Sequence, residues 1–324
     1  MTFSKHALDI DAAGEIERTT KFIREALSHK LKRRGAVVGL SGGIDSSVVA
    51  ALCVRALGKE RVLGLHMHER ESSEQTRRLS KSIADALGIA TADEDITPLL
   101  QAAGCYRRRD EAIRSVIAGY GPGWKSKIVL PSLLDSDMLR IYSVVVRAPD
   151  GAEHSARLTQ DAYLTIVAAT NFKQRVRKML EYFHADRMNY AVAGTPNLLE
   201  YDQGFFVKNG DGAADFKPIA HLYKSQVYQL AAALGVPEEI RSRPPTTDTY
   251  PLSQSQQEFY FSLPYEQMDL CLYAKNHGVP AADAGRALGL NERQVERVYR
   301  DIEAKRGFAR YLHLPPLSLL QSPA

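Results

Sequence analysis

The stretch that most constrains the fold of this chain is a strand, a glycine turn and a helix in direct succession. The apolar run Ala36–Leu40 is followed by the turn Ser41–Ser47, with the sequence SGGIDSS, and then by the apolar run Val48–Leu57, which ends at Gly58. Glycines let a backbone approach an anion closely, and the free N–H groups at a helix start point toward it. The stretch therefore predicts a phosphate-binding loop; the alternative is a glycine turn that only tightens the junction.

This loop lacks the lysine of the common nucleotide-binding loop, GxxxxGK[ST], and is expected to bind phosphate in another way. The hydroxyl groups of Ser41, Ser46 and Ser47 supply further hydrogen-bond donors. Asp45 carries a negative charge among them, which is compatible with bound phosphate when Mg²⁺ lies between the carboxylate and the phosphate oxygens. The sequence therefore predicts a magnesium-assisted phosphate site at Asp45.

The composition is that of a globular protein. The chain has 324 residues, 44% hydrophobic and 25% charged, which suits one large α/β domain or a domain with an appendage. Its net charge of +4 is too small to indicate nucleic-acid binding. The chain has no apolar run long enough to span a membrane, and its polar start does not resemble a signal peptide. We therefore expect a cytoplasmic protein with no membrane or nucleic-acid partner, and reduced thiols at Cys53, Cys105 and Cys271.

Strand-like and helix-like segments alternate along most of the chain. Four apolar segments are expected to be strands: Ala36–Leu40, Arg61–His66, Ile89–Ile96 and Met188–Gly194. Helical patterns accompany them at Ala12–Lys32, Val48–Leu57, Ser73–Leu87, Thr165–His184 and His221–Gly235. This alternation predicts an α/β fold with a doubly wound parallel sheet and helices on both faces.

Ligands of such sheets bind where the carboxyl ends of the strands meet. The loops Ser41–Ser47, His66–Ser73 and Thr195–Glu200 each follow an expected strand, so we expect them to lie together at this edge. Asp45 and Glu200 then approach each other. Two carboxylates from separate loops are a usual way to hold Mg²⁺ on a triphosphate, so the pair is the expected metal site.

Residues 104–160 form the least regular part of the sequence and are expected to be an insertion. Arg140–Arg147 alternates as a strand, Pro149-Asp150-Gly151 predicts a turn, and His154–Leu158 could return as the second strand of a β-hairpin. The charge run Arg107–Arg109 is expected to be a solvated face.

Cations follow the insertion on the helix Thr165–His184. Lys173, Arg175 and Arg177 lie near the expected nucleotide site, where we expect them to bind an anion; a basic solvent face is the alternative. Lys224 begins a later helix, where the helix dipole disfavours a cation, so it is expected to hold phosphate.

The last part of the chain is expected to be helical and to belong to the same domain. We place residues 1–260 in the main domain and 261–324 in a helical C-terminal segment. The polar loop Ser242–Gln256 brings Thr246 and Thr247, which could close over the site. Ala281–Arg300 resembles a helix-turn-helix, but its basic stripe is weak, so packing of small helices is favoured over DNA binding.

The motifs, taken in order, resemble those of NAD synthetases, ligases of the ATP pyrophosphatase superfamily with an adenine nucleotide alpha hydrolase-like fold. The matching segments are GLSGGIDSSVVAAL, VLGLHMHERESS, Asn171–Arg177, Gly194–Glu200, Gly204–Asp215, Leu222–Val227 and Pro244–Thr246. The first motif is shared with GMP synthetases and tRNA-thiolating enzymes, whereas the later ones are not. The resemblance implies that ATP adenylates the carboxylate of deamido-NAD and releases pyrophosphate, after which ammonia displaces AMP to give NAD.

The resemblance also implies roles for individual residues. Those expected to bind ATP are Ser41, Gly42, Gly43, Asp45, Ser46, Ser47, Thr195, Lys224 and Thr246. Asp45, Lys224 and Thr195 are the expected catalytic residues, and Asp45 and Glu200 the expected Mg²⁺ ligands. Residues expected to contact the acyl substrate are Arg175, Arg177, Tyr182, Phe205, Lys208 and Asp211.

Two departures from the family pattern keep an alternative open. Pro196–Leu199 replaces polar residues that the family often has between Thr195 and Glu200, and extra residues precede Asn171. The chain could therefore be a related ligase that amidates another carboxylate; a nucleotide-sensing DNA-binding regulator is a third hypothesis. The family further implies a homodimer, and ammonia that is either free or supplied by a separate glutaminase.

Overall fold

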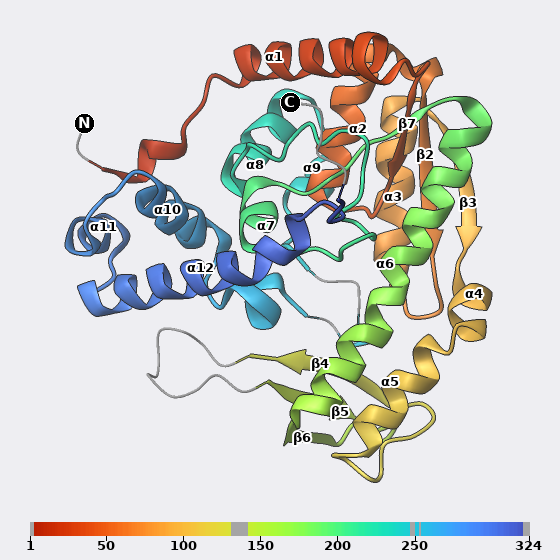
Figure 1. Ribbon diagram of the computed structural model, residues 1–324, viewed down its shortest axis with the longest axis vertical. Helices are drawn as coiled ribbons and strands as arrows, with labels where there is room; N and C mark the ends of the chain where they lie inside the picture. Colours follow the sequence, from red (N-terminus) through yellow and green to blue (C-terminus); the bar gives the residue numbers. More distant parts are fainter. Residues whose placement is uncertain (1–2, 131–141, 247–249, 253, 320–324) are drawn as a thin grey trace.

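The computed structural model describes residues 3–130, 142–246, 250–252 and 254–319. At its centre lies a parallel sheet with the strand order β3-β2-β1-β7 (Figure 1). Its strands are β1 (Ala36–Gly39), β2 (Val62–His68), β3 (Ala90–Asp95) and β7 (Ala191–Val192). The four predicted strands are therefore present and parallel.

Helices cover both faces of this sheet. Successive side chains of β1 point to opposite faces, and because they are apolar on both faces, both have to be covered. Ala36 and Val38 pack among α1 (Ala12–Glu25), α2 (Ile44–Leu57), α3 (Glu74–Leu87) and α8 (Lys224–Ala233). Val37 packs on the other face, with α4 (Thr97–Ala102), α5 (Cys105–Arg114) and α6 (Gln160–Met188). The fold is the doubly wound α/β fold that the sequence predicts. The expected first helix continues past α1 as a π-helical segment, Ala26–Leu31.

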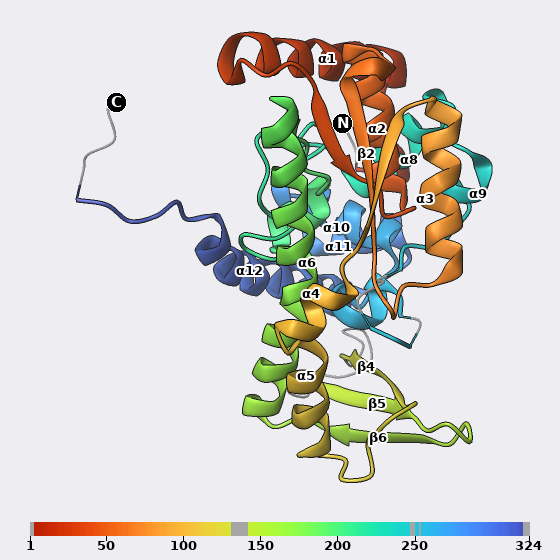
Figure 2. The same cartoon turned by 90° about the vertical axis from the view of Figure 1, so that its right-hand side faces the viewer.

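A second, antiparallel sheet lies at the far end of α6 from the parallel sheet (Figure 2). It contains β4 (Lys125–Val129), β5 (Ser143–Arg147) and β6 (Glu153–Arg157), in that order. The predicted hairpin is present as β5 and β6, although residues 140–141 of its first expected strand lie outside the described residues. The sheet has a third strand, β4, which the sequence analysis did not predict. Ile128 and Val144 pack against Ile166 of α6, which fixes the sheet to that helix.

Buried ion pairs join α5 and α6 to the loop after β2. Lys173 is almost fully buried, and its Nζ lies 2.8 Å from Glu69 Oε1 and 2.7 Å from Glu71 Oε2. Arg109 of α5 is also buried and binds Glu71 through two nitrogens, at 2.7 and 2.9 Å. The expectation that Lys173 binds an anionic ligand is therefore wrong, and so is the expected solvation of Arg109. Both side chains neutralise protein carboxylates that α5 and α6 cover.

The C-terminal segment is helical, as expected. It comprises α10 (Tyr265–Asn276), α11 (Ala281–Leu288) and α12 (Glu292–His313). Ala284 of α11 and Val295 of α12 pack together with Ala274 of α10 in a small apolar cluster. The resemblance to a helix-turn-helix thus corresponds to packed small helices. Among the described residues, none of the helices combines the length and the apolar character needed to cross a membrane.

Candidate active site

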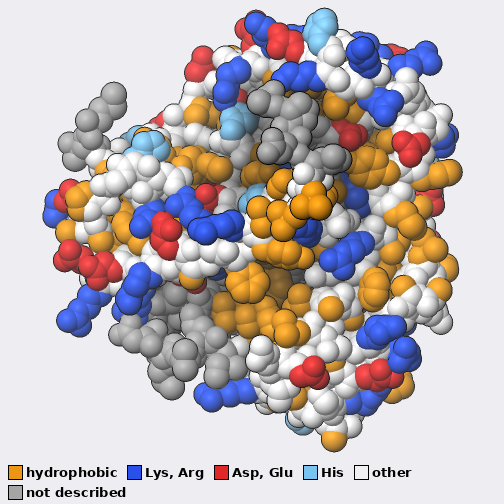
Figure 3. Space-filling model, viewed as in Figure 1, with side chains coloured by type: hydrophobic (Ala, Val, Ile, Leu, Met, Phe, Trp, Pro, Cys, Tyr) orange, Lys and Arg blue, Asp and Glu red, His pale blue; other side chains and the backbone are white. Residues whose placement is uncertain are grey.

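A cavity of about 1210 Å³ opens at the carboxyl edge of the parallel sheet. Its walls come from the turn after β1, the loop after β2, the residues after β7, and from α3, α6, α8 and α12. Figure 3 shows a hollow in the middle of one face of the molecule, with hydrophobic side chains gathered around it. The loops that the sequence places at this edge do meet there.

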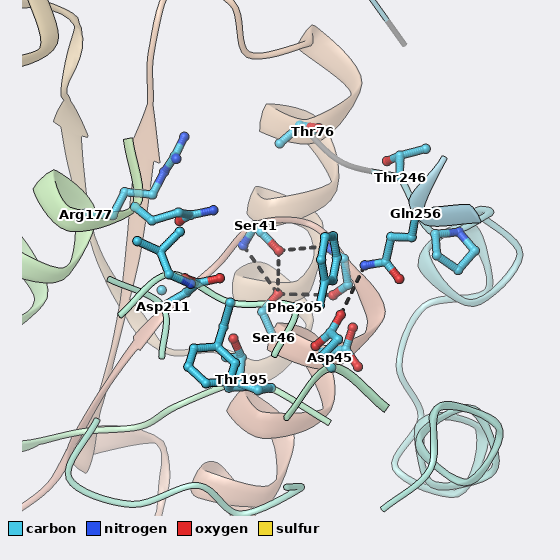
Figure 4. Close-up of a pocket in the computed structure, with 18 of the residues that line it drawn as sticks. Ser41, Asp45, Ser46, Thr76, Arg177, Thr195, Phe205, Asp211, Thr246 and Gln256 are labelled. Carbon is cyan, nitrogen blue, oxygen red and sulfur yellow. Dashed lines mark hydrogen bonds between the residues drawn. The ribbon is translucent and has the colours of Figure 1, made fainter. Parts of the chain in front are cut away.

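The turn after β1 presents an open helix end to the cavity. Gly43 precedes α2, and no side chain of the described residues caps this helix start, so its N–H groups remain available to an anion. Ser41, Gly43, Asp45 and Ser46 line the cavity (Figure 4). Ser46 Oγ accepts from the N–H of Ser41 at 3.3 Å and donates to the carbonyl of Gly43 at 3.1 Å. These contacts hold the loop in the shape expected of a phosphate cradle.

Two residues of the predicted loop shape it without lining the cavity. Gly42 has a φ of +70°, and a Cβ there would lie 2.8 Å from the carbonyl oxygen of Thr76. The hydroxyl of Ser47 is buried and donates to the carbonyl of Gly43 at 2.8 Å. Direct contact of Gly42 and Ser47 with ATP remains a prediction.

Asp45 lies at the meeting point of three elements. Its Oδ1 accepts a hydrogen bond from Asn197 Nδ2 at 2.9 Å, and its Oδ2 pairs with Nζ of Lys224. Lys224 is the first residue of α8 and is buried. Burial alone would lower the pKa of Lys224, but the charges of Asp45 and Glu200 outweigh it and hold the pKa above its usual value. Lys224 therefore remains charged at the start of α8, although the helix dipole disfavours a cation there, because Asp45 and Glu200 stabilise its charge.

Glu200 is the second carboxylate at this point, as predicted. It lies in the first turn of α7 (Leu198–Gln203), where Asn197 caps the helix and its N–H donates to Glu200 Oε2 at 3.3 Å. Gln256 Nε2 donates to Glu200 Oε1 at 3.1 Å. Burial and the nearby charge of Asp45 raise the pKa of Glu200 to about 7, although Lys224 opposes this. An added positive charge between the carboxylates would relieve their repulsion.

Sequence analysis missed two side chains that hold these carboxylates. Asn197 had a detectable signal, because Asn-x-x-Glu is a pattern that starts a helix with reciprocal capping. Gln256 had none, since it reaches Glu200 from a distant loop. Predicted residue Thr246 lines the cavity and accepts from Arg243 Nη2 at 3.1 Å. Predicted residue Thr195 also lines it, whereas Thr247 lies outside the described residues.

Three of the six residues expected to contact the acyl substrate line the same cavity. Arg177 donates from Nε to the carbonyl of Met67 at 3.1 Å, at the end of β2. Phe205 stacks on Tyr260, with ring centroids 4.8 Å apart. Asp211 accepts from the N–H of Val207 at 2.7 Å, and burial raises its pKa. In Figure 4 these three side chains lie around the phosphate loop.

The other three do not line the cavity of this chain. Arg175 donates from Nε to the carbonyl of Lys208 at 3.3 Å, and Tyr182 donates to Asp215 Oδ1 at 3.3 Å. Lys208 Nζ donates to the carbonyls of Tyr311 and Leu314, at 2.9 and 3.1 Å. Their contact with the acyl substrate remains a prediction.

Comparison with known proteins agrees with this geometry. The sequence model of a family described as NAD synthase matches residues 15–117 and 138–310. The chain belongs to the NAD synthase family. The matched ranges contain the turn Ser41–Ser47, Glu200, Lys224 and Gln256. Of the residues that line the cavity, Leu130 and Leu312 lie outside these ranges.

Similar proteins of known name agree with the NAD synthase family. The chain is 58% identical to an NH(3)-dependent NAD(+) synthetase from Mesorhizobium japonicum, over 96% of this chain and 97% of that protein. It is 34% identical to the protein of the same name from Thermotoga maritima, over 91% of this chain and 96% of that protein. Both alignments run nearly end to end.

Solved structures share the fold. An NH3-dependent NAD synthetase from Campylobacter jejuni has a TM-score of 0.61 and 23% identity, over 95% of this chain and all of that one. An NMN synthetase from Francisella tularensis has a TM-score of 0.61 and 20% identity, over 96% of this chain and 99% of that one. These likenesses show that this member of the NAD synthase family has the expected α/β fold.

Proposed function

We propose that the chain is an ammonia-dependent NAD synthetase, a ligase that forms a C–N bond. It adenylates the carboxylate of deamido-NAD with ATP, and ammonia then displaces AMP to give NAD. One observation carries this proposal: a phosphate loop with an open helix end shares a cavity with Asp45, Lys224 and Glu200, in a chain of the NAD synthase family. A carboxylate is a poor acyl donor, and the paired charges suit the pyrophosphate that its activation releases.

In the first step, a carboxylate oxygen of deamido-NAD attacks the α-phosphorus of ATP. A new P–O bond forms, and the bond from the α-phosphorus to the bridging oxygen breaks, so pyrophosphate leaves with the electron pair. The start of α2 has no side-chain cap, and Ser41 and Ser46 line the cavity, so we assign the departing phosphates to this turn. Lys224 supplies a fixed positive charge beside them, and Thr195 a further hydroxyl.

Asp45 and Glu200 are the proposed ligands of Mg²⁺. The donor set fits a hard divalent cation, because the two carboxylates lie close together, and burial together with the charge of Asp45 raises the pKa of Glu200 to about 7. When bound, Mg²⁺ neutralises charge on the transferring phosphates. The protein's own part is to fix the two carboxylates, through Asn197 on Asp45 and Gln256 on Glu200.

In the second step, the nitrogen lone pair of ammonia attacks the acyl carbon of the adenylate. The C–O bond to AMP breaks, AMP leaves with the electron pair, and the new amide nitrogen loses a proton. Thus the reaction requires no covalent nucleophile from the protein. The names of the relatives give ammonia as the nitrogen donor, and they do not support the separate glutaminase that we considered.

Deamido-NAD is favoured over another carboxylate. The alternative arose partly from the segment Pro196–Leu199, which lacks familiar polar residues of the family. In the structure, Asn197 of this segment binds Asp45 and caps the helix that carries Glu200, so the segment keeps a polar role at the site. The names of two relatives that are 58% and 57% identical to this chain point the same way.

A homodimer is the assembly we propose. Three large apolar side chains of α6 are more than half exposed: Leu164 at 54%, Met179 at 54% and Phe183 at 57%. Met179 and Phe183 lie one helical turn apart and form an apolar pair on the surface, which a partner could cover. Arg175 and Tyr182 lie on the same helix and do not line the cavity of their own chain. If a second copy of the chain packs on α6, Arg175 and Tyr182 can contact the acyl substrate bound to that copy.

The test is a reaction of the purified protein with ATP, Mg²⁺, ammonium and deamido-NAD. We expect pyrophosphate, AMP and NAD in equal amounts, and no pyrophosphate when Mg²⁺ is chelated. A panel of other carboxylates run in parallel should release pyrophosphate far more slowly. Absence of NAD with deamido-NAD as substrate would rule the proposal out.

A further inference from the structure

A segment that comprises residues 250–252 and 254–257 links the antiparallel sheet to the active site, which Leu130 and Tyr142, at the ends of β4 and β5, also line. The N–H of Leu252 donates to the carbonyl of Ser126 at 3.2 Å, and Nε2 of Gln254 donates to the carbonyl of Ile128. Ser126 and Ile128 belong to β4, the strand at the edge of the sheet. The segment therefore covers backbone acceptors that an edge strand leaves open.

The attachment is buried, unlike an ordinary surface loop. Gln254 is 1% exposed and Tyr250 is 5% exposed. Tyr250 packs in the apolar cluster that joins Ile128 of β4 to Ile166 of α6, and its ring meets Phe259 edge to face at 5.6 Å. A buried amide that donates to a strand carbonyl fixes both the position and the orientation of the backbone around it.

The next residues of the same segment belong to the active site. Gln256, two residues after Gln254, donates to Glu200 and lines the cavity. Ser255 forms a β-bridge with Thr246, which also lines the cavity and lies beside Arg243. Gln254 thus connects the antiparallel sheet to Gln256 and Thr246, which line the cavity.

We propose that Gln254 is a positioning residue, which uses the antiparallel sheet to hold Gln256 and Thr246 at the nucleotide site before ATP binds. This gives the antiparallel sheet, which lies within the predicted insertion of residues 104–160, a role in the reaction. The inference rests on the proposed function, because it takes ATP as the nucleotide. Without the attachment, ATP has to order the segment on binding, and the cost of that ordering weakens the apparent affinity.

The test compares Gln254→Met with Gln257→Met. Methionine keeps about the length of the buried side chain and removes its amide: the Nε2 donor, and Oε1, which has no hydrogen-bond partner among the described residues. Gln257 is exposed in the same segment and is the matched control. We expect Gln254→Met to raise KM for ATP roughly tenfold, while kcat at saturating ATP stays within about twofold, since ATP binding restores the order. The control should match the wild type.

Amide hydrogen exchange gives a second readout that does not depend on turnover. Without ATP, residues 250–261 should exchange faster in Gln254→Met than in the wild type, with β1 unchanged, and saturating ATP should restore protection. Unchanged KM and exchange, equal effects in both variants, a fall in kcat without a rise in KM, or failure of Gln254→Met to fold would each overturn the inference. Failure of the wild type to form NAD would instead overturn the proposed function.

Discussion

Asp45 connects three parts of the chain at a single carboxylate. It stands in the first turn of α2, accepts from Asn197 before α7 and pairs with Lys224 at the start of α8. None of these contacts belongs to the apolar core, because the side chain lines the cavity. Its charge therefore matters to the reaction more than to the packing of the fold.

Asp45→Asn tests this directly. The amide keeps the size of the side chain but removes the charge that pairs with Lys224 and the proposed Mg²⁺ ligand. We expect kcat/KM for NAD formation to fall by at least about 10²–10³-fold, as for loss of a strong electrostatic contact in a transition state. The circular dichroism spectrum should stay close to that of the wild type, while the melting temperature should fall, because the buried Lys224 loses its ion pair with Asp45 and keeps only the nearby charge of Glu200. Turnover near that of the wild type would contradict the assignment of Asp45.

Asn197 offers a test of positioning that separates capping from catalysis. Both Asn197 and Asn291 cap a helix reciprocally, with Glu200 and Gln294 as their partners. Replacing either by Ala should remove a helix cap worth about 1 kcal/mol, with a further loss of stability at Asn197, which is buried, whereas Asn291 is exposed. Only Asn197→Ala also removes the hydrogen bond to Oδ1 of Asp45, so it alone should lower kcat, by roughly tenfold for about 1.4 kcal/mol. Equal steady-state activity of the two variants would contradict a positioning role for Asn197.

At the level of elements, α5, α6 and the loop after β2 are joined by charges that are buried together. Tyr106 adds a hydrogen bond to Glu69 Oε2 at 2.7 Å, beside the pairs that Lys173 and Arg109 form with Glu71. Removing one partner of a buried pair leaves an uncompensated charge, which is far more costly than losing an exposed pair. This cluster should therefore dominate how the region responds to acid.

The prediction concerns Glu71. Burial opposes its ionisation, but hydrogen bonds and charges from Arg109 and Lys173 outweigh it and lower the pKa to about 2. A depressed carboxylate stabilises the fold above its unfolded pKa of about 4.3 and loses that contribution as pH falls toward the folded value. The free energy of unfolding should thus fall by up to about 3 kcal/mol from this group between about pH 5 and pH 2.

Chemical unfolding of Glu71→Gln at about pH 7 and pH 3 checks this linkage. The variant should be less stable than the wild type at neutral pH, and it should lose less stability on acidification. Glu111→Gln is the matched control, because Glu111 pairs with Arg107 on the exposed side of α5, the helix that also carries Arg109. The control should follow the wild type at both pH values. A wild type and a Glu71→Gln variant with the same pH dependence would contradict the argument.

These elements also show where reading the sequence succeeds and where it stops. The strand around Val37 was predictable because an apolar run buried on both faces needs no knowledge of its partners. The roles of Lys173 and Arg109 were not, because their carboxylates lie in a distant segment that only the folded chain brings close. The strand β4 has two buried residues, Ser126 and Ile128, and too little apolar pattern to be recognised.

At the scale of the whole molecule, one part of the candidate site could be predicted from the sequence and another could not. Asp45 and Glu200 could be placed together from the sequence, since both follow strands of one parallel sheet. Gln256 could not, because its position depends on the antiparallel sheet, whose contact with the segment around Gln254 involves backbone groups without a sequence signature. The position of Asp45 and Glu200 follows from the order of the strands in the parallel sheet, and the position of Gln256 follows from its contact with the antiparallel sheet.

The outer face of α6 provides the prediction for the assembly. Leu164, Met179 and Phe183 present apolar surface that a second copy of the chain would bury. Phe183→Asp places a charge in that interface, so the dimer should dissociate at least about 100-fold more readily, a change of about 2.7 kcal/mol. Light scattering coupled to size exclusion across a dilution series measures this. Phe22→Asp, on the partly exposed surface of α1, is the control and should remain dimeric. Arg175 and Tyr182 lie on this helix outside the cavity of their own chain, so dissociation should also raise KM for deamido-NAD. A monomeric wild type, or a Phe183→Asp variant that dimerises as tightly as the control, would contradict the proposal that α6 forms the dimer interface.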